Sequence, residues 1–235
     1  MDDHIARHPL LRPVRRAADC SVAALILAGA AWAARAVWEV RLAMAGQPAS
    51  GPPDQGGGWH RPLTALENAY HVVTAVSHGV VLLCGFVFVA WLWRVRDNGV
   101  ALSRERPRYP GFWVYLGWVL PIANLWVPRG LVADAYRASA PGRRLPTALN
   151  VWWALWLVGL GSGVGVGIGA GHTDSPDELV ARAYSGVWLL LAYDAAVVGA
   201  AVAAVFVVRA VTAAQQERAA TWTAPAPDLQ GPEAA

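Results

Sequence analysis

Long apolar runs dominate this sequence and fix its fold class. They cover residues 19–44, 63–93, 148–171 and 183–208. Each is long enough for a helix that crosses the hydrocarbon core of a bilayer, which takes roughly 20 apolar residues. We therefore predict an all-α integral membrane helix bundle with four transmembrane helices. The lipid bilayer is then its first partner, and a cell membrane is its location.

A further apolar stretch, residues 110–128, is interrupted by proline. Pro121 and Pro128 each remove a backbone donor and break a helix. Arginines crowd both flanks, in 94–108 and in 129–144. Cytoplasmic loops of membrane proteins collect arginine, so both flanks belong on the cytoplasmic side. The stretch is predicted to be a re-entrant hairpin that enters and leaves on one face; the alternative is a fifth crossing.

Charge also orients the other segments. The arginine-rich tail, residues 1–17, is predicted to be cytoplasmic, whereas the 46–62 loop with its single arginine and the acidic 171–182 loop are predicted to lie outside. The C-terminus then returns to the cytoplasm. We expect one multi-pass membrane-embedded domain over 18–212, followed by a disordered tail over 213–235.

The basic residues of this chain do not indicate a nucleic-acid partner. All 19 are arginine, they lie in loops beside apolar runs, and the net charge is only +3. Arginines in this distribution set membrane topology. They do not form the basic patch of a protein that binds a phosphate backbone. We therefore expect no nucleic acid among the partners.

Polar side chains follow one face of the 63–93 span. Glu67, His71, Thr74 and His78 recur at spacings of four, three and four residues, which aligns them on one helical stripe. Ionisable groups at membrane depth are costly and normally face the bundle interior. The stripe is either a hydrogen-bonded packing feature or an acid–base relay. His71 and His78 lie about 10 Å apart along the axis, so we predict neither a metal nor a cofactor.

Two other spans carry buried charge. Asp194 lies near the middle of the last span, with no basic residue within a helical turn or two. Burial disfavours the charged form of a carboxyl group, so Asp194 is expected to be protonated much of the time. It is either a proton donor or a partner in an interhelical hydrogen bond. In the first span, Arg35 and Glu39 are four residues apart and can pair on one face.

Tryptophan is unusually frequent, with 13 residues. Some fit the aromatic belt of a membrane interface, but others lie deeper in their segments. Aromatic faces stabilise cations, most strongly when desolvated. We predict an apolar cavity that binds a lipophilic small molecule. Its predicted lining residues are His78, Trp118, Asn124, Trp126, Trp156, Trp188 and Tyr193.

The hairpin and the segment after it carry a family resemblance. The run PIANLWVP at 121–128, preceded by PGFW at 110–113 and followed by WWALW at 152–156, resembles the actinobacterial membrane family described as domain of unknown function 4328. The likeness extends from about residue 72 to the last span. It implies a polytopic bacterial membrane protein and supplies no chemistry.

These features combine into a specific functional hypothesis. Proton-initiated cyclisation of an isoprenoid requires an acid, an aromatic-lined cavity that guides the carbocation, and a base. The layout, with one Glu in an early span and one Asp in the last, is similar to that of integral-membrane terpene cyclases. We predict such a cyclase acting on a prenylated lipophilic substrate. Asp194 or Glu67 would be the general acid, and His71 the relay or terminating base.

Two other classes of function remain open on the sequence. The first is a non-catalytic membrane partner or assembly protein, whose arginine-rich inner face binds anionic lipid or another protein. The second is a small transporter or proton conductor that uses the ionisable residues of two spans. Those residues are Glu67, His71, His78 and Asp194.

Overall fold

The computed structural model describes residues 11–103, 107–160 and 175–223, and the regular secondary structure in these ranges is helical apart from one isolated bridge between Asp54 and His60. Three helices are long and apolar enough to cross a membrane: α1 (Arg15–Ala45), α2 (Ala65–Ser103) and α7 (Val187–Thr223). The shorter elements are α3 (Trp113–Val119), η1 (Ala123–Leu125), α4 (Val127–Ser139), α5 (Thr147–Gly159) and α6 (Pro176–Ser185). The prediction of an all-α membrane helix bundle is confirmed.

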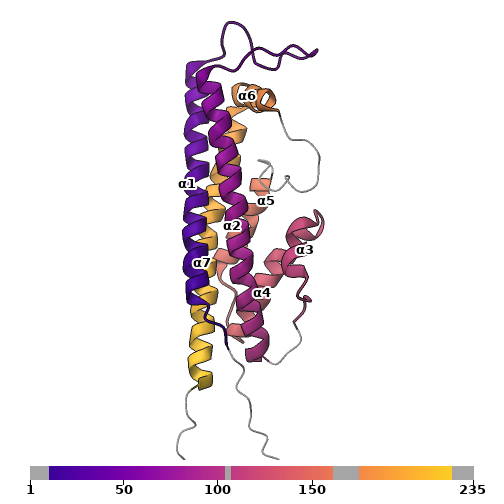
Figure 1. Cartoon of the computed structure of the whole chain (residues 1–235). Helices are drawn as coiled ribbons and strands as arrows, with labels where there is room; N and C mark the ends of the chain where they lie inside the picture. Colours follow the sequence, from indigo (N-terminus) through magenta and orange to yellow (C-terminus); the bar gives the residue numbers. More distant parts are fainter. Residues whose placement is uncertain (1–10, 104–106, 161–174, 224–235) are drawn as a thin grey trace, which may run out of the picture.

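The three long helices stand side by side as a column (Figure 1), with α1 packed against both α2 and α7. Trp32 and Trp91 are fully buried inside it. Large apolar side chains on the outer faces are exposed, including Ile26, Phe86 and Phe206. A helix that is apolar on all sides is typical of a membrane span, so the outer faces of this column contact lipid.

One end of the column, which we call the terminal end, is tied together by Asn98. The Arg12 amide donates to Asn98 Oδ1 at 2.9 Å, and Asn98 Nδ2 donates to the Arg12 carbonyl at 2.8 Å. Asn98 Nδ2 also lies 3.3 Å from Gln215 Oε1 on α7. The opposite end, the loop end, carries residues 46–64 and α6 (Figure 1). The start of α1 and the end of α7 therefore lie at the same end of the molecule.

The 110–128 stretch forms no long helix. It is divided into α3, η1 and the start of α4. Pro121 follows the end of α3, and Pro128 lies in the first turn of α4, where its missing N–H would be unpaired in any case. Figure 1 shows α3 and α4 beside the half of the column nearer the terminal end.

The two ends of this stretch meet. Arg96 Nη2 on α2 donates to the carbonyl of Tyr109 at 3.1 Å. The Tyr109 ring also lies against Gly130, where an added Cβ would come within 2.7 Å of it. Beyond α4, Arg143 pairs with Glu217 of α7 at 3.0 Å. The stretch thus returns to the end from which it starts, as predicted for a re-entrant segment.

Several predicted boundaries differ from the structure. Of the predicted crossing at 148–171, the structure describes α5, which packs on α7, while residues 161–171 lie outside the described ranges. The predicted disorder of 213–223 is wrong, since α7 continues to Thr223. The reason is interhelical bonding: Gln215 donates to the Val95 carbonyl at 2.9 Å. Residues 1–10 and 224–235 lie outside the described ranges.

Candidate functional site

Arg35, Glu39 and Asp194 meet in the interior of the column, in a group that we call the buried cluster. Arg35 Nη2 lies 2.9 Å from Asp194 Oδ1 and 3.0 Å from Glu39 Oε1. Arg35 Nε donates to Asp194 Oδ2 at 3.3 Å. The three side chains are at most 3% exposed. One guanidinium therefore serves two carboxyl groups at a depth where water is excluded.

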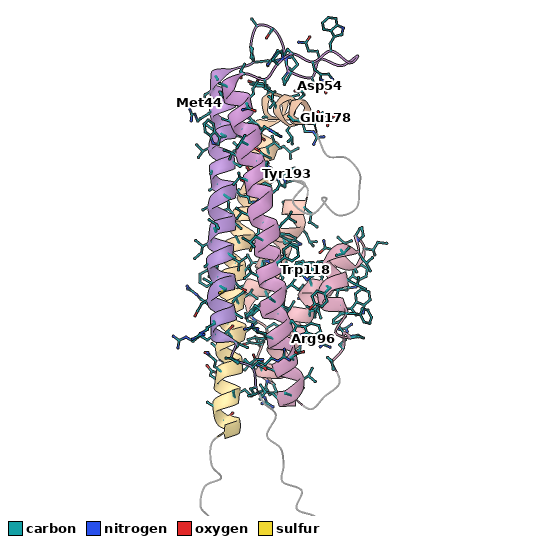
Figure 2. The ribbon with its side chains drawn as sticks, viewed as in Figure 1. Met44, Asp54, Arg96, Trp118, Glu178 and Tyr193 are labelled. Carbon is teal, nitrogen blue, oxygen red and sulfur yellow. The ribbon has the colours of Figure 1, made fainter. Side chains whose placement is uncertain are left out.

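Helix α2 completes the surroundings of the cluster. The Tyr70 hydroxyl donates to Glu39 Oε1 at 3.0 Å, while Glu39 Oε2 has no hydrogen-bond partner. The Arg35 guanidinium lies 4.2 Å from the centre of the Trp32 ring, and His78 contacts that ring edge-on. Figure 2 labels Tyr193, the neighbour of Asp194, in the half of the column nearer the loop end.

A heptad-like stripe on α1 explains why the cluster is buried. The buried positions of α1 are Ala18, Ser21, Leu25, Ala28, Trp32, Arg35, Glu39 and Leu42. Their spacing alternates between three and four residues, which is the seam pattern of a helix packed lengthwise on its neighbours. The predicted pairing of Arg35 with Glu39 is confirmed. The stripe was the available signal that both residues face the core.

The charges of the cluster do not balance. With both carboxyl groups ionised, one guanidinium leaves a net charge of −1, and an uncompensated charge is costly in a membrane interior. The Glu39 and Asp194 carboxyl groups both contact the same atom, Arg35 Nη2. One proton on either carboxyl group makes the cluster neutral. The arrangement can therefore bind and release one proton.

Glu67 belongs to a different site, at the loop end. Arg61 contacts both its carboxylate oxygens, at 2.6 and 2.8 Å. The Thr64 amide donates to Glu67 Oε2 at 2.7 Å and the Tyr184 hydroxyl to Oε1 at 3.0 Å. Burial, reinforced by this bond, raises the pKa of Tyr184 to about 12, so Tyr184 remains a donor at neutral pH. Glu67 thus clamps the 46–64 loop and α6 onto α2.

The predicted aromatic residues are divided between a cavity and the surface. Trp118 and Trp156 line an apolar cavity of about 90 Å³ together with Trp152. Figure 2 shows Trp118 on α3 at the side of the column. Trp126 is 53% exposed and Trp188 83% exposed. Both therefore face outward and not into a cavity.

The other predicted site residues do not enter that cavity either. Asn124 is buried within η1, whereas His71 and Tyr193 are half-buried. Neither Asp194 nor Glu67 is among the residues that line the cavity. The prediction of one chamber shared by acids and aromatic rings is therefore wrong. The physical reason is ion pairing. Asp194 pairs with Arg35 and Glu67 pairs with Arg61, and neither arginine lines the cavity beside the tryptophans.

Comparison with known proteins assigns the family. The family model described as Domain of unknown function (DUF4328) matches residues 62–213. This chain belongs to that family. No curated protein and no solved structure matches it. The DUF4328 match includes Asp194 and Glu67, but Arg35 and Glu39 lie before its first residue. In this DUF4328 protein the buried cluster is therefore completed by a helix from outside the matched region.

The clamp around Glu67 allows a direct test in this DUF4328 protein. Replacing Tyr184 with Phe removes one hydrogen bond to a buried carboxylate and is expected to cost about 1–2 kcal/mol of unfolding free energy. Denaturant unfolding in detergent micelles measures the change. Tyr115→Phe is the matched control, because Tyr115 is exposed and its variant should unfold like the wild type. Equal stability of the Tyr184 variant and the control would contradict the clamp.

Proposed function

We propose that this protein is a proton-binding membrane protein, acting as a proton conductor or proton-coupled transporter, with Glu39 and Asp194 as its proton site. The observation that carries the proposal is that two fully buried carboxyl groups share the guanidinium of Arg35. Ionisable residues inside membrane spans commonly mark proton relays and ion pathways. Uptake of one proton neutralises the cluster, and its release restores the negative charge.

The polar groups around the pair come from all three long helices. On α1 these are Arg35 and Glu39 itself, and on α7 Asp194. On α2 the Tyr70 hydroxyl already donates to Glu39. His78, also on α2, contacts the Trp32 ring over which the Arg35 guanidinium lies. Because Glu39 and Tyr70 come from different helices, a change in the charge of the pair alters the contact between α1 and α2.

Proton flux into liposomes tests the proposal. The full chain is reconstituted with a pH-sensitive dye inside, and a potassium diffusion potential drives protons inward. Wild type is expected to acidify the lumen, whereas Asp194→Asn and Glu39→Gln should fall to the rate of protein-free liposomes. Asp97→Asn is the control, since Asp97 lies at the terminal end and is partly exposed. Unchanged flux in Asp194→Asn, or no flux in wild type, would overturn conduction.

An infrared measurement separates proton binding from transport. A carboxyl group that holds a proton has its own C=O stretching band, distinct from that of a carboxylate. This band is expected in wild type at neutral pH and should disappear in Asp194→Asn or Glu39→Gln, but persist in Asp97→Asn. Its absence from wild type would show that the cluster holds no proton.

The charge distribution supports an orientation for this function. The terminal end carries arginines from the N-terminal segment, from α2 and from the α4–α5 connection, among them Arg12, Arg96 and Arg143. Because arginine accumulates on the cytoplasmic side, we infer that both termini are cytoplasmic and that α6 lies outside in a multi-pass cell-membrane protein.

The terpene cyclase stays a prediction. It requires an acid at the wall of an aromatic-lined cavity, and the cavity beside Trp118 has apolar surroundings without a carboxyl group among the described residues that line it. A lipophilic substrate would have to fit the same cavity of about 90 Å³. The paired carboxyl groups support proton binding more directly, which is why proton binding is preferred here.

A further inference from the structure

A second cavity, of about 320 Å³, opens at the terminal end of the molecule. It lies between the last turns of α2, residues 107–109, α4 and the last turns of α7. Four arginines and one carboxylate are among its described lining residues: Arg96, Arg108, Arg137, Arg218 and Asp134. Counting four positive and one negative charge, the described lining carries a net charge of +3. Figure 2 shows Arg96 in this region.

Only some of the hydrogen-bond donors of these arginines have partners within the protein. Arg137 pairs with Asp134 at 3.1 Å, and Arg96 donates one bond to the Tyr109 carbonyl. The Nε atoms of Arg96 and Arg218 are buried but have no hydrogen-bond partner. An unpaired buried donor costs free energy. An anion in the cavity would accept bonds from the guanidinium groups that line it and offset the excess positive charge.

We propose that this cavity binds a phosphate group, carried either by the headgroup of an anionic lipid or by a small soluble phosphate monoester. Guanidinium groups form paired, charge-assisted hydrogen bonds with phosphate oxygens. The volume is at the lower end of the range of small-molecule sites and suits a phosphate with a small substituent. The site lies at the opposite end from α6 and is independent of the proton-binding cluster.

Arg218 and Arg209 provide a matched pair of variants on α7. Arg218 lines the cavity, whereas Arg209 is exposed and does not line it. The full chain is placed in nanodiscs of phosphatidylcholine, either with added phosphatidic acid or with glycerol 3-phosphate in solution. The midpoint of thermal unfolding, followed by tryptophan fluorescence during titration, gives an apparent Kd for each probe.

We expect a phosphate probe to raise the midpoint of the wild type. Arg218→Gln should raise the apparent Kd of that probe by about tenfold, because one charge-assisted hydrogen bond is lost. Arg209→Gln should retain the wild-type Kd. Stabilisation by phosphatidic acid alone identifies a lipid headgroup, and stabilisation by glycerol 3-phosphate identifies a soluble phosphate monoester. If Arg218→Gln is unstable in phosphatidylcholine alone, Arg137→Gln takes its place, because Arg137 lines the same cavity but is exposed.

Two results would overturn the proposal. Equal weakening by Arg209→Gln and the cavity variant would mean that diffuse surface charge, and not the cavity, attracts the phosphate. Failure of both probes to stabilise the wild type would mean that the cavity does not bind phosphate. Neither result depends on whether the protein conducts protons.

Discussion

Arg35→Leu is expected to destabilise the protein by about 3–5 kcal/mol, the cost of breaking a buried ion pair by removing one partner. Arg35 is the guanidinium shared by Glu39 and Asp194, and its side chain is 3% exposed. Without it, the two carboxyl groups face each other in a dry interior. Unfolding in mixed micelles with increasing denaturing detergent, followed by circular dichroism, measures the loss.

Arg41→Leu is the control for the Arg35 variant. Arg41 is on the same helix and also stacks on a tryptophan, at 4.2 Å from the centre of the Trp38 ring, but it is exposed. An exposed cation–π contact is worth about 0.5–1 kcal/mol. Adding Asp194→Asn to Arg35→Leu should recover part of the stability, because it removes one uncompensated charge. Similar losses from the two arginine variants would contradict a special role for the cluster.

Gly117→Ala is expected to destabilise the hairpin by about 1–3 kcal/mol through overpacking. An added Cβ at Gly117 would lie 2.7 Å from Cγ1 of Val127, closer than van der Waals contact permits, so α3 and α4 would have to separate. Hydrogen exchange followed by mass spectrometry measures the effect, and faster exchange is expected in α3 and α4 than in the wild type. Helices α1 and α7 should exchange as before.

Gly79→Ala tests whether the effect comes from packing. Gly79 lies in the middle of α2, and an added Cβ there would meet no atom within 4 Å. Alanine favours a helix over glycine by about 0.5–1 kcal/mol, so this variant should be neutral or slightly stabilising. The two Gly→Ala changes thus have opposite expected signs. Unchanged exchange in the Gly117 variant would show that α3 does not pack tightly on α4.

The sequence predicted those features that depend on local spacing or on a general rule of membrane proteins. Pro121, Pro128 and the flanking arginines were sufficient to predict a hairpin whose ends meet, as the contact of Tyr109 with Gly130 shows. The pairing of Arg35 with Glu39 followed from their separation by one helical turn.

The partner of Asp194 could not be predicted in the same way. The turns of α7 around Asp194 contain no cation, and the sequence does not state which span lies beside α7. The structure supplies α1 as that neighbour and Arg35 as the cation. The position of a residue along a segment likewise does not reveal where its side chain points: Trp126 and Trp188 were expected to line a cavity but are exposed. Both errors concern tertiary neighbours, which spacing alone does not determine.

Helix α1 supplies part of the buried cluster, although it lies outside the region that defines the family. The stretch that defines family membership begins at residue 62, after the whole of α1. That stretch on its own would present Asp194 without a counter-charge, along with the faces of α2 and α7 that α1 covers. The family match and the packed helix bundle therefore have different limits in this chain, and a fragment cut at the family boundary would leave the Asp194 carboxyl group without Arg35 in the bilayer.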